Sequence, residues 1–247
     1  MSVITLGIAL FGLLFEPALA APLTPVAVQA APFSVEVSGV LTSDRFILRA
    51  PGCKGDACMA IRHENMQGGE ASLWIVPQFG VYGGAAHDVE STAAATYSGA
   101  GYSVHGGVKG GFQVRHGLGL NGWLAVTHAE TRVVLEPGVE APTGPSDEAR
   151  RNQFELGAAA RFGEVDGGFD AWVGVEAMPF CVDRTRVVHG ELKLGLKPFI
   201  PVSAVGGIRV ISDPLGGPWA KRGRLSAGVT GEVGYRVGVT GWLTASL

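Results

Sequence analysis

The sequence has little net charge, few cysteines and no apolar run long enough for a membrane-spanning helix. Its 247 residues carry a net charge of −3, so no basic excess indicates a nucleic-acid partner. Its N-terminal apolar stretch, residues 3–15, is shorter than the about 20 residues that a helix needs to cross a bilayer. The 38 glycines are spread through alternating segments and form no low-complexity tract. These features exclude a nucleic-acid-binding domain and argue against a disordered chain.

The N-terminus indicates export. The apolar stretch is followed by Ala18, Leu19 and Ala20, which predicts a signal peptide over residues 1–20, cleaved between Ala20 and Ala21. An uncleaved anchor is the alternative, and no basic residue precedes Arg45. No cysteine follows the cleavage point, so a lipoprotein is not indicated.

The three cysteines are Cys53, Cys58 and Cys181. In an oxidising compartment the first two, separated by a short loop with glycine, are predicted to form a disulfide. The other pairings remain open. Zinc is the weaker interpretation because only His63 lies nearby as a third ligand.

The last stretch, residues 224–247, alternates without a break. Its odd positions are apolar, glycine or tyrosine and carry no charge, whereas the even positions are polar, charged or glycine apart from Trp242. A period of two predicts β-strand with one apolar face. The stretch is too long for one strand, so we expect a hairpin with its turn near 236–240 and an odd number of loop residues.

The same alternation recurs along the chain. Residues 21–70 are expected to form an N-terminal extension with short strands at 33–40 and 45–49, and residues 71–247 the main domain. Strands there are predicted at 73–81, 102–114, 122–126, 153–162, 169–177, 188–196 and 200–210, followed by the closing hairpin. This gives nine strands; eight remain open if one has been split, and ten if the segment from 33 to 49 joins the sheet.

The expected connections alternate in length. Short ones are predicted at 116–121, 163–168, 197–201 and 236–240, and longer ones at 84–98, 136–150, 179–187 and 212–223. Soluble strands average about five or six residues, whereas several segments here alternate for about ten, the length of a tilted membrane strand. We therefore predict an all-β fold, an antiparallel up-and-down transmembrane β-barrel of about eight to ten strands. A secreted soluble β-sandwich is the alternative.

With its leader, its repeated hairpins such as residues 233–237 and its loop alternation, the chain resembles the small outer-membrane β-barrel proteins of Gram-negative bacteria. The resemblance covers about residues 71–247 and implies short periplasmic turns, longer extracellular loops and a location in the bacterial outer membrane. It also implies a monomer that contacts outer-membrane lipid and lipopolysaccharide and is inserted by the barrel assembly machinery. The chain ends in Leu247, where such proteins often end in an aromatic residue.

The polar face is predicted to line the lumen, where charges of both signs can pair. Trp123 and Trp242 fall in the same register, so they are either packed inside or placed at a membrane interface. The expected network is His105, Lys109, Arg115, Glu155, Arg161, Asp170, Glu176, His189, Glu191, Lys193, Arg209, Glu232 and Arg236.

No catalytic or metal-binding pattern stands out. Ser103 and His105 share a strand face but lie too far apart to assume contact, and His128 is expected at the surface rim. His189 and Glu191 form a polar pair without a third metal ligand. No cofactor is predicted, and we expect a non-enzymatic structural or surface-interaction role with a lumen filled by side chains. A narrow passive channel and a membrane-surface lipid A hydrolase are alternative functions, and a secreted β-sandwich binding protein is a third.

Overall fold

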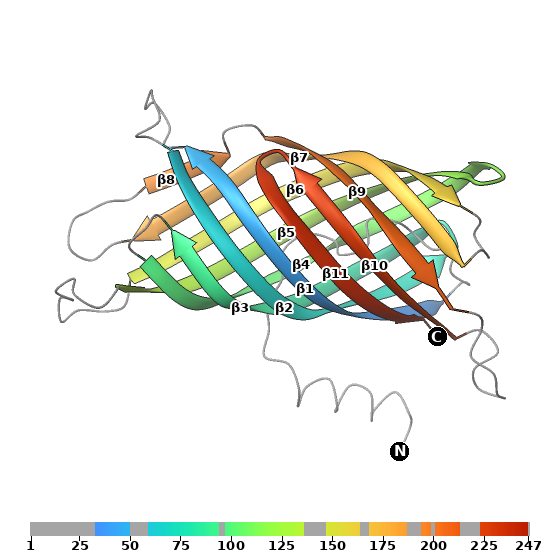
Figure 1. The fold of residues 1–247 in the computed structure, drawn as a ribbon, viewed down its shortest axis with the longest axis horizontal. Coiled ribbons are helices and arrows are strands. Elements are labelled where there is room, and N and C mark those ends of the chain that lie inside the picture. Colours follow the sequence, from blue (N-terminus) through green and yellow to red (C-terminus); the bar gives the residue numbers. More distant parts are fainter. Residues whose placement is uncertain are drawn as a thin grey trace, which may run out of the picture.

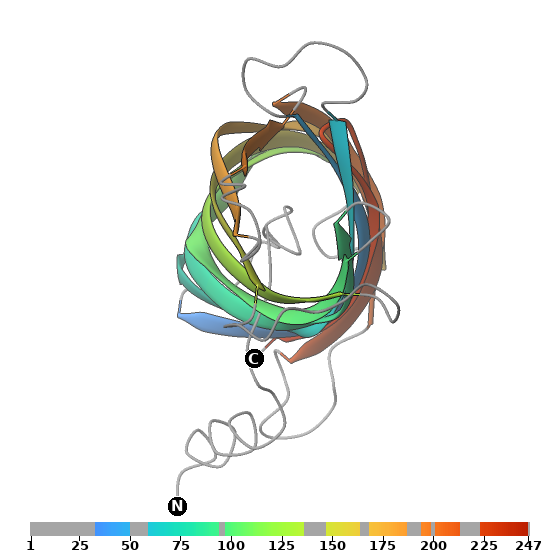
Figure 2. The ribbon, with the colours of Figure 1, turned by 90° about the vertical axis from the view of Figure 1, so that its left-hand side faces the viewer.

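The described strands form one antiparallel sheet that closes on itself, as the end-on view in Figure 2 shows. The computed structural model describes residues 33–49, 59–93, 97–135, 147–163, 168–186, 194–198, 201–212 and 223–246. Within these ranges no helix is long and apolar enough to cross a membrane. The strands are β1 (Ser34–Arg49), β2 (Met59–Val76), β3 (Phe79–Ala93), β4 (Tyr97–Arg115), β5 (Leu118–Leu135), β6 (Asp147–Gly163), β7 (Phe169–Arg186), β8 (Leu194–Pro198), β9 (Val202–Ile211), β10 (Arg224–Val233) and β11 (Arg236–Ser246).

The first and last strands close the wall. β1 and β11 pair from Glu36 opposite Ser246 to Phe46 opposite Arg236. β8 and β9 both pair with β7, so they share one position and the described wall has ten strand positions. The predicted antiparallel barrel is confirmed. The expected boundary at residue 71 falls inside β2. β1 belongs to the wall, because it pairs with β2 on one side and with β11 on the other, and it brings the number of strand positions to ten.

The expected turn at 197–201 does not reverse the chain. β8 pairs with Asp183, Arg184 and Thr185 near the end of β7, and β9 pairs with its first half, so both run in the same direction. Because the chain does not reverse between β8 and β9, every strand after β8 runs opposite to the predicted direction. β9 ends and β10 begins at the short-turn end, whereas the connection at 212–223 was predicted among the longer loops of the other end, and the tip between β10 and β11 points away from the short-turn end (Figure 1).

The predicted strand 73–81 is a hairpin. β2 ends at Val76, Pro77 and Gln78 form the turn, and β3 begins at Phe79. A register shift lies between Trp74 and Val76. As a result, odd-numbered apolar residues face outward on both strands, and the alternation in the sequence continues through the turn. Proline suits the turn because it has no N–H to contribute to a ladder.

The closing stretch forms the predicted hairpin, with an odd loop placed slightly earlier. Val233 pairs with Val237 across residues 234–236. Valines on both arms face outward, as the alternation predicts. Tyr235, assigned to the apolar face by its odd number, instead turns inward and is 1% exposed.

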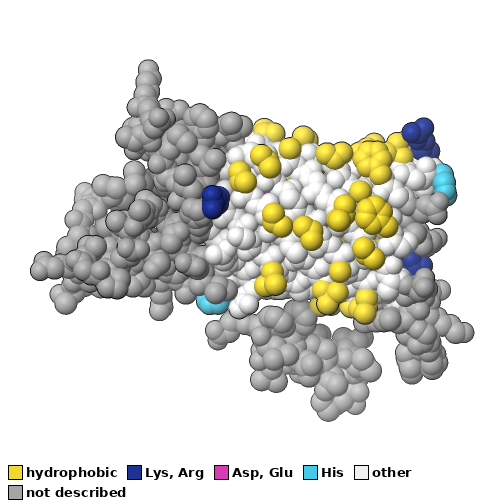
Figure 3. All heavy atoms as spheres, viewed as in Figure 1, with side chains coloured by type: hydrophobic (Ala, Val, Ile, Leu, Met, Phe, Trp, Pro, Cys, Tyr) yellow, Lys and Arg dark blue, Asp and Glu magenta, His cyan; other side chains and the backbone are white. Residues whose placement is uncertain are grey.

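The outer face carries an apolar band. In Figure 3 hydrophobic side chains occupy the middle of the wall, and Lys, Arg and His side chains lie toward its ends. Exposed phenylalanines gather at the short-turn end, next to strand ends, and Tyr102 and Phe180 lie toward the other end. The phenylalanines at the short-turn end are Phe33, Phe79, Phe112, Phe162 and Phe169.

The height of the band fits a bilayer. Tyr102 and Phe112 lie on the outward face of β4 near its two limits. With a rise of about 3.3 Å per residue and a tilt of about 40°, the strand between them spans roughly 25 Å along the barrel axis, the height of the apolar band on outer-membrane barrels. Above Tyr102 the outward face becomes polar: Tyr102 donates to Glu130 at 3.1 Å, and Arg150 lies 3.5 Å from Glu130.

Candidate functional site: the barrel interior

Interior aromatic rings lie against the wall over glycines of the neighbouring strand. A Cβ built on Gly157 of β6 would overlap the indole of Trp123 on β5, and one on Gly228 of β10 would overlap Trp242 on β11. Glycine is needed here because a ring in contact with the next strand leaves no room for a side chain. The same arrangement recurs at Trp172 over Gly207, Tyr82 over Gly107 and Trp74 over Gly80.

Trp123 and Trp242 lie inside the barrel and not at a membrane interface. Trp123 is 3% exposed and Trp242 5% exposed, both on the inner face, so the packed position is the correct one of the two considered. Trp172 and Trp242 lie with ring centroids 6.4 Å apart. Together with Val40, Met66, Ala86, Ala159 and Val205 they form an apolar cluster inside the barrel.

A lysine-centred cluster joins β1, β2 and β4 in the interior. The Lys109 Nζ lies 3.0 Å from Glu70 Oε1 and 3.9 Å from Glu36 Oε2. His105 Nε2 lies 3.2 Å from the other oxygen of Glu70. The lysine also lies 5.4 Å from the ring centroid of Tyr82, a distance at which the ring face attracts a cation. All these partners are buried, so the Lys109 ammonium has its carboxyl partners inside the barrel.

A second ionic group lies toward the short-turn end. Arg209 of β9 donates through Nε and Nη2 to both oxygens of Asp170 on β7. Arg161 of β6 approaches the same carboxylate at 4.0 Å. Two-point contact between a guanidinium and a carboxylate fixes both side chains in one geometry.

The largest polar group surrounds the tip of the β10–β11 hairpin. The Tyr235 hydroxyl lies 2.5 Å from Glu176 Oε1 and 3.2 Å from Glu155 Oε1. Arg236 Nη2 lies 3.4 Å from Glu176, and Arg236 Nε bonds Glu232. We call Asp44, Glu155, Glu176, Glu232, Tyr235 and Arg236 the hairpin-tip cluster.

Neighbouring donors tie this cluster to the rest of the wall. Trp123 Nε1 donates to Glu176 Oε2 at 3.0 Å, and Gln153 Nε2 donates to Glu155 Oε1 at 2.8 Å. Next to it, Arg151 of β6 makes two hydrogen bonds of 2.6 and 2.9 Å with Glu64 of β2. Side chains from strands far apart in the wall therefore meet inside the lumen.

Nine residues of the predicted polar network are buried on the inner face. Arg115 is not among them: it is exposed near the end of β4, beside the turn at 116–117. His189, Glu191 and Lys193 lie outside the described residues, as do the predicted signal peptide, Cys53 and Cys58. Cys181 is buried on the inner side of β7. The nine are His105, Lys109, Glu155, Arg161, Asp170, Glu176, Arg209, Glu232 and Arg236.

Sequence reasoning missed several members of these clusters. Glu36, Asp44, Glu64 and Glu70 lie on β1 and β2, in the segment set aside as an extension. For Glu36 and Glu70 the even numbering, between odd positions that are apolar or glycine, is the signal that could have placed them on the polar face. Asp44 and Glu64 give no such signal, because their odd-numbered neighbours are polar or charged. Tyr235 gives no such signal, because its direction depends on the turn.

The residues considered for catalysis are not arranged as a hydrolase. His105 contacts Glu70, whereas Ser103 Oγ is buried without a hydrogen-bond partner. His128 lies on the outer face with its Nδ1 2.8 Å from Asn152 Oδ1. Acyl-transfer chemistry needs a nucleophile within hydrogen-bond reach of its base, and these side chains do not provide it. In the described part of the chain, no three His, Cys, Asp or Glu side chains are placed to hold a metal ion.

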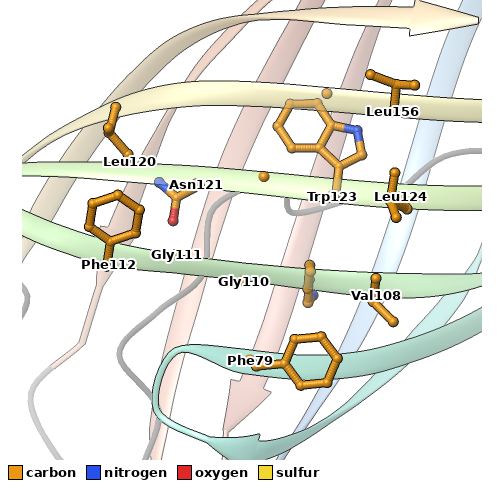
Figure 4. A pocket seen from close by; sticks show the side chains of 13 residues that line it. Phe79, Val108, Gly110, Gly111, Phe112, Leu120, Asn121, Trp123, Leu124 and Leu156 are labelled. Carbon is orange, nitrogen blue, oxygen red and sulfur yellow. The ribbon is translucent and has the colours of Figure 1, made fainter.

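A pocket of about 540 Å³ lies at the wall formed by β3 to β6. Figure 4 shows Phe79 on β3, Phe112 on β4 and Leu120 and Leu124 on β5 among its lining side chains. These side chains belong to the outer apolar band, and Gly110 and Gly122 make the wall thin between them. The pocket lies at the height of the short-turn half of the band, where lipid chains would meet it.

The barrel is similar in structure to the COG4313 outer membrane channel from Pseudomonas putida F1, with a TM-score of 0.38 and 11% sequence identity over 92% of this chain and 99% of that one. A weaker similarity is to OccK11 (OpdR) of Pseudomonas aeruginosa, with a TM-score of 0.18 and 8% identity over 88% of this chain and 97% of that one. No family model and no curated protein matches the chain.

Proposed function

We propose that the chain is an integral outer-membrane β-barrel whose lumen is closed by its own side chains, with a structural or surface-interaction role and no catalytic activity. The observation that carries this proposal is the burial of large and charged side chains throughout the interior. Trp74, Tyr235, Lys109, Arg151 and Arg209 are each at most 2% exposed. Barrels of about this strand number have interiors that side chains can fill.

The outer surface supports membrane insertion. An exposed apolar band of about bilayer height, aromatic residues near its limits and a closed wall without a free edge match what lipid requires. A secreted β-sandwich offers no reason to expose so many large apolar side chains on one continuous surface.

The strand lengths support a role at the surface. β4 has 19 residues and β2 has 18, whereas about ten residues cross the membrane at this tilt. The excess lies beyond Tyr102, at the end opposite the short turns. We infer that this end projects from the cell and presents the connecting loops to outside partners, with lipopolysaccharide around its base.

Planar-bilayer recordings of the refolded full chain at pH 6 test the closed lumen. We expect no large, long-lived open conductance. A Trp123→Ala/Trp242→Ala variant, which removes two interior rings, is the positive control and is expected to conduct. A steady conductance of the wild type equal to that of the hollowed variant would contradict a closed lumen and favour a narrow passive channel.

Two further observations test location and chemistry. Folded barrel is expected to migrate differently on gels before and after boiling and to sediment with outer membranes. Mass spectrometry of lipid A is expected to show the same acylation with and without expression. A change in acylation that is lost in His105→Ala would support the hydrolase alternative instead.

A further inference from the structure

A cluster of polar side chains lies on the outer face of β4, β5 and β6, directly above the apolar band. We call Tyr102, His128, Glu130, Arg150 and Asn152 the outer rim cluster. In the ladder Glu130 lies opposite Tyr102 on one side and Arg150 on the other, and His128 lies opposite Asn152. The cluster therefore spans three adjacent strands at the level where the barrel leaves the hydrocarbon layer.

The cluster is organised around the Glu130 carboxylate. The Tyr102 hydroxyl donates to Glu130 Oε2 at 3.1 Å, and Arg150 Nη2 lies 3.5 Å from Glu130 Oε1. His128 Nε2 lies 4.0 Å from Glu130 Oε2, and His128 Nδ1 lies 2.8 Å from Asn152 Oδ1. The rings of Tyr102 and His128 lie 6.4 Å apart between centroids. These contacts hold the guanidinium, the imidazole and the phenol together along the outer face.

The stability of the barrel gives little reason for this arrangement. The side chain of Arg150 is 55% exposed and that of His128 is 38% exposed. Ion pairs exposed to this degree contribute little to folding. A guanidinium presents a planar fork of N–H donors, so Arg150 can bind a group outside the barrel while it stays beside Glu130.

The surface immediately below the cluster is apolar. Val104 on β4 is 38% exposed and Val126 on β5 is 61% exposed. Val104 lies two residues from Tyr102, and Val126 lies two residues from His128, which is about 7 Å along a strand. An acyl chain lying on these valines therefore brings its polar head to the cluster. The surface matches an amphiphile with chains below and an anionic group above.

Phosphate is the anionic group that fits these donors. Arginine binds phosphate through parallel N–H···O bonds from its planar fork. Asn152, whose Oδ1 accepts from His128, also has amide N–H donors. Cationic side chains close to a membrane surface attract anionic lipid head groups.

We propose that the outer rim cluster binds a phosphate group of lipid A, the phosphorylated glycolipid of the outer leaflet, with Arg150 as the main ligand. The acyl chains then lie on Val104 and Val126. This site rests on the proposed function, because it requires the end of the barrel beyond Tyr102 to lie at the outer leaflet. Glu130 holds Arg150 in place but does not bind the lipid, because a carboxylate repels phosphate.

Native mass spectrometry of the refolded full chain in detergent micelles tests the site with purified lipid A as the probe. A chelator is present, so that no divalent cation can bridge Glu130 to a phosphate. The wild type is expected to retain lipid A and to lose most of this retention when the phosphates have been removed from the lipid. Equal retention of the two forms would overturn the site, and this comparison needs no variant that has to fold.

Variants identify the residues that bind. Arg150→Gln is expected to weaken retention about fivefold, the factor that one cation near a charged membrane surface supplies. Arg115→Gln removes an exposed cation at the opposite end of β4 and is the matched control, expected to change nothing. Equal weakening by the two variants would indicate general charge attraction and overturn the site.

The remaining comparisons concern the ligand. Glu130→Gln is expected to tighten retention, because it removes the repulsion; weaker retention would make the carboxylate a ligand and overturn a phosphate site. Inorganic phosphate at the same concentration is expected not to displace lipid A, because it makes no contact with the valines. Displacement by it, or equal retention of phosphatidylglycerol, would overturn the assignment to lipid A.

These results are separable from a failure of the proposed function. Loss of lipid A binding in a barrel that still migrates differently before and after boiling overturns the site alone. A chain that does not sediment with outer membranes overturns the proposed location, and with it the reason to expect lipid A.

Discussion

At the scale of single residues, inward-facing glycines determine how the interior packs. A Cβ on Gly107, Gly157, Gly207 or Gly228 would lie less than 3.0 Å from the aromatic side chain over it, and one on Gly80 would lie 3.1 Å from Trp74. The abundance of glycine is therefore a packing requirement at these positions.

Gly157→Ala is expected to lower the free energy of unfolding by about 1 to 3 kcal/mol, because the added methyl group overlaps the Trp123 indole. Gly241→Ala is the matched control: a Cβ there meets nothing within 4 Å. Urea titration of the refolded protein, followed by the boiled and unboiled gel bands, measures the difference. Equal stability of the two variants would show that the ring moves away at no cost.

Alternation predicts which face of the sheet a side chain lies on, but it does not predict which neighbouring side chains or strands that side chain contacts. It placed Lys109, Glu155 and Arg236 on the polar face, where they are buried. It did not predict that Trp123 leans over a glycine, because that depends on which strand is its neighbour. Tyr235 was assigned to the wrong face because turn geometry, and not parity, orients a loop residue.

At the scale of elements, ionic contacts join strands that do not pair. Arg151 and Glu64 connect β6 with β2 inside the barrel, and both side chains are at most 2% exposed. The pair therefore ties together parts of the wall that share no ladder.

Arg151→Met is expected to cost about 3 to 5 kcal/mol of unfolding free energy, because it leaves Glu64 buried without its guanidinium. Arg150→Met, one residue along and exposed, is expected to cost less than about 1 kcal/mol. Adding Glu64→Gln to Arg151→Met should recover part of the loss. A double variant no more stable than Arg151→Met would contradict an uncompensated charge as the cause.

Strand boundaries were the least predictable part of the elements. The segment at 73–81 was predicted as one strand, but it contains a turn across which the apolar alternation continues. A turn that reverses the chain was predicted at 197–201, but β8 and β9 run in the same direction. In both places the side-chain pattern is nearly the same for the two arrangements. Only the pairing partners distinguish them.

At the scale of the whole molecule, the apolar band fixes the level of the barrel in the membrane. Val175 lies on the outer face of β7 between Phe169 and Phe180, in the middle of the band. Asn152 lies on the outer face of β6 beside His128, at the polar margin.

Val175→Arg is expected to destabilise the barrel in lipid by about 2 to 4 kcal/mol, and Asn152→Arg by no more than about 1 kcal/mol. Unfolding titrations in liposomes measure both. Similar costs at the two positions would contradict the proposed placement of the membrane.

The pairing of β1 with β11 also has a consequence for folding. Ser38 and Thr244, hydrogen-bonded at 2.6 Å across this seam, are 206 positions apart in sequence. Apart from the short contact of β8 with β1, the other neighbouring pairs in the described wall join strands close in the chain, so they can form locally. Contacts between residues so distant in sequence form slowly, because the chain entropy of a large loop is lost before any contact is gained. Closure at this seam is thus expected to be the slow step of assembly, with β1 exposing an open edge until the last hairpin arrives.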